Sequence, residues 1–190
     1  MDKKKLIGTI IGVTMFAALI AGATFAWLTI SATVTNGNYD TGSRNFVIDY
    51  TAGNSITSLP ILTVTSAGDV ASSGASSVTV TAKLNNTNSP KGDLTLTLDT
   101  TTDGGTFVNS KAIRYAVKIG NGTPTAPQMV TSDPQILVLS GTNNTTQLID
   151  STTAKSITVY MWLDAETITN AMIGKQYAGK INASATQRED

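Results

Sequence analysis

The first 30 residues constrain this chain more than any other stretch, because a basic start precedes a long uncharged run. Lys3, Lys4 and Lys5 are followed by an uncharged stretch that extends from Leu6 to Ile30. A helix of this length would be about 37 Å long, enough to cross a bilayer core of about 30 Å. A basic start before an apolar run is typical of an export signal or a membrane anchor. The sequence therefore predicts that the lysines stay in the cytoplasm and that the rest of the chain is exported.

The end of this run changes from helix-like to strand-like chemistry. Up to Ala26 the residues are mostly small and apolar, as signal peptidases require, so the bond between Ala26 and Trp27 is the expected cleavage point. From Trp27 on, apolar and polar residues alternate strictly, which indicates a half-buried β-strand. Its apolar face consists of Leu28, Ile30, Ala32 and Val34. We expect a signal peptide or membrane anchor over 1–26, an N-terminal strand over 27–36 and a folded domain over 37–190.

The side-chain inventory excludes several kinds of site. The chain contains neither cysteine nor histidine, which excludes thiol catalysis, cysteine-based metal centres and imidazole zinc sites. The formal net charge is zero, and residues 27–190 carry a small acidic excess without a basic cluster, so nucleic acid is a poor partner. We therefore expect a protein that is not an enzyme, with no catalytic residue, no metal site, no cofactor and no nucleic-acid partner.

Asp93, Asp99 and Asp103 are the remaining candidates for chemistry. They flank expected strands and turns, where aspartate commonly bonds to the local backbone. The favoured interpretation is that they are solvated turn residues. A calcium site between loops is the better of two functional alternatives, because carboxylates supply hard oxygen ligands. A catalytic carboxylate pair is the other.

The folded part reads as a series of short alternating stretches separated by turn residues. This pattern, in a domain rich in Thr, Ser, Asn and Gly, predicts an all-β fold, specifically a jelly-roll-like antiparallel β-sandwich. The expected strands include 45–50, 77–85, 93–99, 113–119, 136–139, 156–164 and 177–187. Strands 77–85 and 93–99 are expected to pair as a hairpin with one face on the core. Residues 165–174 are the one stretch with a helical pattern.

Tyr160 and Trp162 make the strand over 156–164 bulky on both faces, which predicts a central strand or one covered on its second face. Packing under a loop or against a neighbouring subunit is the favoured role of these two side chains. A sugar-binding platform is the alternative.

Three stretches of the chain resemble one protein family. Residues 3–29, with Gly22-Ala23-Thr24-Phe25-Ala26 at their end, resemble the signal peptides handled by the SipW-type signal peptidase. Residues 38–48 are similar to the segment that follows in such proteins, and residues 159–187 to their C-terminal pair of strands. The family is the TasA/camelysin group of secreted biofilm-matrix proteins.

This resemblance implies a fold and a function. Members resemble jelly-roll sandwiches that polymerise into extracellular fibres, in which the N-terminal strand of one subunit completes the sheet of the next. Carried over, Ala26 ends the signal and residues 27–35 form the donor strand, with Leu28, Ile30, Ala32 and Val34 on its apolar side. The expected partners are further copies of the chain and the signal peptidase during export. A cell-surface or matrix nucleator stays open as a third.

The physical properties of such a strand support the same interpretation. An alternating strand at a free terminus can fill a groove in a neighbouring sheet, and head-to-tail contacts of this kind generate fibres because they do not close. Two alternatives stay open. The strand pairs within its own domain, or the chain is a membrane-anchored cell-surface adhesin or binding module held by an uncleaved segment over 6–30.

Cleavage after Ala26 can be measured directly. We expect the intact mass of the native exported protein to lack residues 1–26, since the small residues before Trp27 suit a signal peptidase. Mass spectrometry of protein isolated from the culture medium and from the membrane fraction checks this. A full-length mass in the membrane fraction alone would indicate the anchored alternative.

Overall fold

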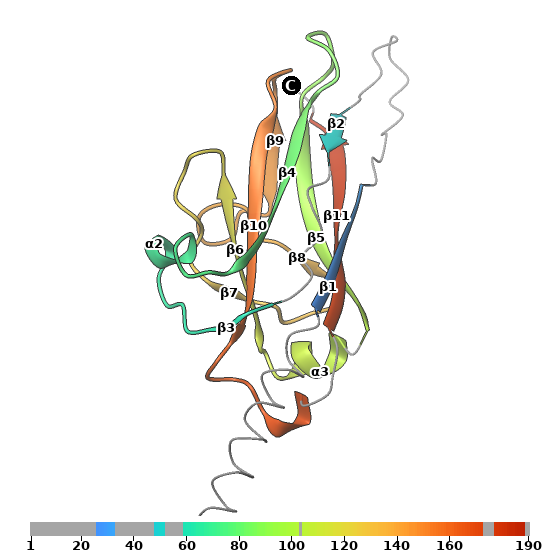
Figure 1. The fold of residues 1–190 in the computed structure, drawn as a ribbon. Helices are drawn as coiled ribbons and strands as arrows, with labels where there is room; N and C mark the ends of the chain where they lie inside the picture. Colours follow the sequence, from blue (N-terminus) through green and yellow to red (C-terminus); the bar gives the residue numbers. More distant parts are fainter. Residues whose placement is uncertain (1–25, 33–47, 52–58, 103, 173–176, 189–190) are drawn as a thin grey trace, which may run out of the picture.

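The computed structural model describes residues 26–32, 48–51, 59–102, 104–172 and 177–188 (Figure 1). Of the predicted signal segment over 1–26, only Ala26 belongs to the described residues, and Val34 of the predicted donor strand lies outside them. Strands dominate the fold, and the helical elements are short: α2 (Ala67–Val70), α3 (Gly104–Asn109) and the 3-10 turn η1 (Asn170–Met172). The prediction of an all-β chain is confirmed.

The strands form two sheets. Sheet A has the order β1-β11-β5-β8, with β9 also paired to β5. Its strands are β1 (Ala26–Ala32), β11 (Tyr177–Gln187), β5 (Gly92–Thr102), β8 (Gln135–Ile136) and β9 (Thr146–Ile149). Sheet B has the order β2-β4-β10-β6-β7, with β3 also paired to β10. Its strands are β2 (Ile48–Thr51), β4 (Ser76–Leu84), β10 (Lys155–Asp164), β6 (Ile113–Ile119), β7 (Gln128–Met129) and β3 (Ile61–Leu62).

The main core lies between the two sheets. One cluster of buried side chains combines residues from β4, β6 and β10 of sheet B with residues from β5 and β11 of sheet A. The predicted inward faces of the alternating strands are buried: Val78, Val80, Ala82 and Leu84; Leu94, Leu96 and Leu98; and Ile181, Ala183 and Ala185. Each buried leucine or isoleucine contributes about 2 kcal/mol through removal of apolar surface from water.

The predicted hairpin of 77–85 with 93–99 is wrong. The first of these strands, β4, pairs with β2 and β10, whereas β5 pairs with β11, β8 and β9 in the other sheet. Alternation identifies the buried face of each strand but not its neighbour, and two such faces can also meet across a sandwich. The polar segment between them crosses from one sheet to the other, and Leu84 N–H bonds to the carbonyl of Ser151 (2.9 Å).

Several finer expectations also need correction. The sandwich is not wholly antiparallel, because β1 pairs with β11 and β3 with β10 in parallel. In the stretch predicted as a buried strand over 136–139, Ile136 is half exposed, and only Leu137 and Leu139 are buried. Regular pairing with β5 there covers only Gln135 and Ile136, and one further backbone bond joins Leu137 N–H to the carbonyl of Leu96 (2.9 Å). The predicted helix over 165–174 is a single 3-10 turn in its described part.

Strand β10 is central in sheet B and is covered on both faces, as the sequence predicts. On the second face, Trp162 is fully buried and Tyr160 is 8% exposed. They pack with Val70 of α2 and Ala116 of β6, against Leu62, Val64 and Ala75. The sugar-platform alternative is wrong, because a fully buried indole offers no surface to a ligand. A loop with a helical turn, residues 63–75, covers both rings instead.

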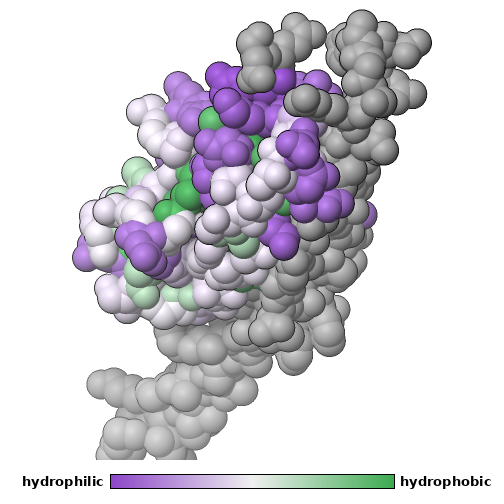
Figure 2. All heavy atoms as spheres, turned by 90° about the horizontal axis from the view of Figure 1, so that it is seen from above, coloured by the Kyte–Doolittle hydropathy of each residue, from purple (hydrophilic) through white to green (hydrophobic). Residues whose placement is uncertain are grey.

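The end of the molecule that carries the C-terminus and the β4–β5 loop is polar. The residues at the tip of this loop, Asn85–Asn88, are exposed (Figure 1). Viewed onto this end, the described surface is largely hydrophilic, with hydrophobic side chains visible only between polar ones (Figure 2). This end therefore has the character of an ordinary solvated surface.

Tyr115 links the two sides of the core. It lies on β6 and is 1% exposed, and its Oη accepts a hydrogen bond from the backbone N–H of Val138 (3.1 Å), just after β8. Burial raises the pKa of Tyr115 above its usual value near 10, although the bond from Val138 opposes part of this rise. The neutral phenol is therefore the form that the fold accommodates.

The raised pKa of Tyr115 predicts that the free energy of unfolding decreases at alkaline pH. Because its pKa is raised on folding, its contribution is fully present below about pH 10, the pKa of an exposed tyrosine, and is lost as pH rises further. Urea unfolding from pH 7 to 11 checks this. Tyr115→Phe is expected to lower the free energy of unfolding by about 1–3 kcal/mol at pH 7, since Val138 N–H loses its acceptor. Above about pH 10, the free energy of unfolding of this variant is expected to fall less steeply than that of the parent chain. An equally steep fall in the variant would contradict the assignment.

Candidate functional site

The first described strand is the outer strand of sheet A. β1 pairs in parallel with β11 over a continuous register that extends from Ala26 opposite Tyr177 to Ala32 opposite Ala183 (Figure 1). β11 in turn pairs antiparallel with β5 through its other edge. The strand that the sequence singled out therefore forms, and in this single chain it completes the sheet of its own domain.

The predicted donor-strand residues stand opposite buried positions of β11. Leu28, Ile30 and Ala32 are in register with Gly179, Ile181 and Ala183, respectively. Each of these three β11 residues is buried. The alternation of the N-terminal strand thus matches the alternation of the edge on which it lies. Ala26 and Trp27, the predicted cleavage pair, are the first two residues of β1.

The outer edge of β11 is suited to receive a strand. An edge strand presents a row of backbone N–H and C=O groups that pair readily with any extended segment. β11 extends from Tyr177 to Gln187, beyond the last residue paired with β1. Main-chain hydrogen bonds along such an edge supply affinity, and alternate side-chain positions supply specificity.

The opposite side of the sandwich is closed by a proline-containing segment. Thr125 N–H bonds to the carbonyl of Val117 (2.8 Å), and Val117 N–H bonds to Oγ1 of Thr125 (2.9 Å), so Thr125 occupies the outer edge of β6. Pro124 and Pro127 flank it in the sequence and lack the N–H that strand pairing needs. This edge is therefore poorly suited to strand addition.

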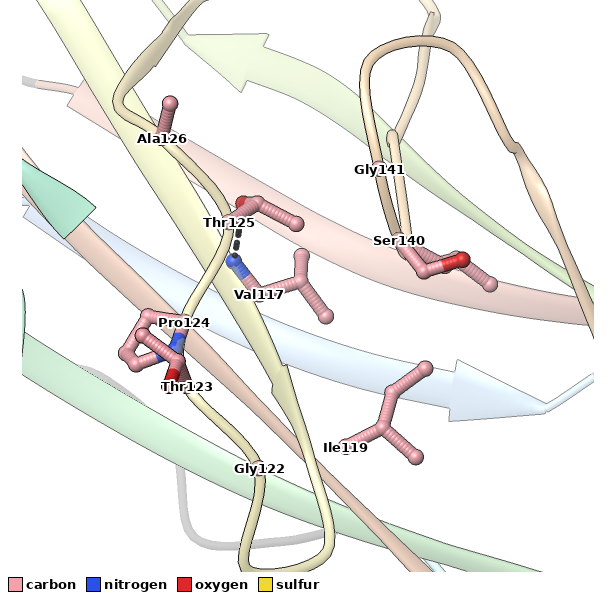
Figure 3. A pocket seen from close by; sticks show the side chains of 10 residues that line it. Val117, Ile119, Gly122, Thr123, Pro124, Thr125, Ala126, Ser140 and Gly141 are labelled. Atoms are coloured by element: carbon pink, nitrogen blue, oxygen red, sulfur yellow. Dashed lines mark hydrogen bonds between the residues drawn. The ribbon is translucent and has the colours of Figure 1, made fainter.

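A hollow of about 370 Å³ lies beside this segment (Figure 3). The side chains of Val117 and Ile119 come from β6, and two loops supply the rest of the lining, residues 122–126 and 139–141. Figure 3 shows these loops on either side, with Thr125 bonded to Val117. The lining contains no ionisable side chain that could act as a general acid or base.

The aspartates that the sequence singled out lie on the surface near single cations. Oδ1 of Asp93 lies 3.8 Å from Nη1 of Arg188, and Oδ2 of Asp99 lies 4.0 Å from Nζ of Lys180. Both ion pairs are partly exposed and therefore contribute little to stability. Asp103 lies outside the described residues. Across the described ranges, no three acidic side chains gather in a way that could hold a metal ion. This geometry favours surface ion pairs over the calcium and catalytic alternatives.

The strand-like edge of Thr125 is the feature that sequence reasoning missed. Residues 123–134 are predicted to be irregular, because prolines interrupt them and no alternation is present. One of the two hydrogen bonds between Thr125 and Val117 joins backbone groups, and the other depends on the threonine hydroxyl, which accepts in place of a backbone carbonyl. The signal that could have found it is the pair of prolines, Pro124 and Pro127, around Thr125, since proline is common on sheet edges.

Comparison with known proteins gives no relative: no family model, no curated protein and no solved structure matches the chain. Among the described residues, the helices are too short to span a bilayer.

The Thr125 edge can be tested by removing the hydroxyl. Thr125→Val leaves Val117 N–H without an acceptor in a buried position, which is expected to cost about 1–3 kcal/mol of unfolding free energy. Thr123→Val, at an exposed position of the same segment, is the control and is expected to change little. Urea unfolding measures both. Equal losses in the two variants would show that the hydroxyl bond has no special role.

Proposed function

We propose that this chain is an exported structural subunit of an extracellular fibre or biofilm matrix, and that it polymerises by donating residues 27–35 to sheet A of the next subunit. The observation that carries the proposal is the pairing of β1 with the outer edge of β11. The proposal includes the TasA-like family and the jelly-roll order of strands, which the resemblance implies.

The contacts of β1 within one chain are those that a neighbour would supply. β1 is the terminal strand in the order of sheet A, and its one paired neighbour among the described strands is β11. A chain whose β1 has left its own β11 exposes an edge that fits an identical strand from a second copy. Because the donor and the acceptor lie on different parts of each copy, the contact is head-to-tail and continues into a fibre.

The connection after β1 supports exchange. Residues 33–47 join β1 in sheet A to β2 in sheet B. A fully extended chain covers about 3.3 Å per residue, so this connection can span about 50 Å, enough to reach another domain. Removal of residues 1–26 would leave Trp27 at the free end, with nearly all of β1 after it. A strand at a free end can leave one sheet and enter another without threading a loop.

One observation favours the second candidate, a membrane-anchored surface domain. β1 begins at Ala26, inside the predicted hydrophobic stretch over 6–30, and lies on its own chain's β11. An uncleaved chain, held by the part of this stretch that precedes β1, would then leave a self-contained domain at the membrane. The binding-module version that relied on Tyr160 and Trp162 is excluded by their burial.

Deletion of the donor strand tests the proposal. Negative-stain microscopy of the mature chain secreted by expressing cells is expected to show fibres, and deletion of residues 27–35 to abolish them while a soluble fold remains. Circular dichroism checks the fold of the deletion variant. Fibres that persist without these residues would overturn strand donation.

Point variants sharpen the same test. Ile30→Asp places a charge opposite the buried Ile181 and is expected to lower fibre yield by at least about tenfold, which corresponds to about 1.4 kcal/mol per link. Thr29→Asp is the matched control, since its register partner is the partly exposed Lys180, and it is expected to leave assembly intact. Equal losses would show that charge, and not the alternating register, governs assembly.

A further inference from the structure

Gly179 differs from the other inward positions of β11. It is buried and lacks a side chain, whereas the buried positions that follow on the same face carry Ile181, Ala183 and Ala185. The ladder to β5 is also irregular here. Ala178 is opposite Thr102 and Gly179 is opposite Thr100, so β5 contributes one residue more than β11. Such a bulge is a common site of bending at a sheet edge.

Polarity alone does not fix where β1 lies along β11. A slip by one residue would bring Thr29 and Ser31 opposite the buried positions of β11, which the hydrophobic pattern disfavours. A slip by two residues keeps apolar residues opposite apolar ones. What distinguishes the observed register from a two-residue slip toward the end of β11 is therefore the size of the residues and not their polarity.

Size distinguishes these registers at one position. In the observed register, Leu28 is opposite Gly179, the one position of the buried face where β11 adds no side-chain volume. A two-residue slip toward the end of β11 brings Leu28 opposite Ile181 and moves Ala26 opposite Gly179. Two large residues then meet, and space beside the glycine is left unfilled. Crowding and cavities each cost about 1–3 kcal/mol or more in close-packed interiors.

We propose that Gly179 fixes the register in which a strand with the sequence of β1 docks on β11, by leaving space that a large apolar residue at position 28 requires. The partner is a second copy of this chain, and the consequence for assembly rests on the proposed strand donation. Gly179 is thereby a specificity-determining residue. It selects donor strands with a large residue at that register position and disfavours strands shifted by two residues toward the end of β11.

An exchange of the two residues tests this size match. Leu28→Gly and Gly179→Leu are each expected to lower fibre yield by at least about tenfold, about 1.4 kcal/mol per link. Mixed together, the two variants are expected to co-assemble, because every link then joins one leucine with one glycine. Ala185→Leu is the control for crowding, since Ala185 is buried on the same face beyond the residues paired with β1.

The register itself can be read by disulfide formation, because the chain contains no cysteine of its own. Neighbouring strands lie at a spacing that a disulfide can bridge. Thr29→Cys combined with Lys180→Cys reports the observed register. Thr29→Cys combined with Asn182→Cys reports the two-residue slip. We expect the first pair to cross-link at least about tenfold more than the second (about 1.4 kcal/mol), and either Leu28→Gly or Gly179→Leu to reduce this preference.

The outcomes separate this inference from the proposed function. If the parent chain forms no fibres but the 29/180 preference depends on Gly179, strand donation fails and the register role stands within one chain. If fibres depend on β1 but neither substitution changes the cross-link ratio, the register role is overturned and strand donation stands. If Gly179→Leu does not fold, as its melting curve would show, Leu28→Gly decides: an unchanged ratio overturns the inference and a lowered ratio supports it.

Discussion

The fold depends on β10 being buried on both faces. Its inner face, with Ile157, Val159, Met161 and Leu163, faces the core between the sheets, and its outer face is covered through Trp162. A strand with two apolar faces is stable only in the interior of a sheet, with partners on both edges and cover on both sides. β4 and β6 provide the edges, sheet A covers one face, and the loop with α2 covers the other. The remaining strands are arranged around this constraint.

The two sides of the sandwich are closed in different ways. On one side, short strands and proline-containing segments occupy the sheet edges, and Thr125 satisfies the backbone of Val117. On the other side, the long strand β11 receives β1, a segment from the far end of the chain. One edge is therefore closed by neighbouring parts of the chain, and the other by a strand from the opposite end of the sequence.

The sequence predicted burial better than it predicted pairing. Period-2 alternation correctly identified the inward residues of β4, β5 and β11, because burial of a strand face is recorded in the strand itself. The partner of each strand is not recorded there, which is why β4 and β5 were expected to form a hairpin. At the candidate site, the existence of β1 could be predicted. Its parallel partner β11, and Gly179 in particular, could not, since that pairing joins residues about 150 positions apart and leaves no local pattern.

The parallel pairing of β1 with β11 also orders events in time. A ribosome synthesises the chain from its N-terminus, so β1 exists before β4, β5 and β10, and long before the strand on which it lies. Contacts between distant parts of a chain form slowly because a large loop must close first. Until β11 has been synthesised, β1 has no strand in its own chain with which to pair. Copies that are already complete contain β11 and its outer edge. Under the proposed strand donation, this order gives a neighbouring molecule the first opportunity to capture the strand, before the chain to which it belongs can compete.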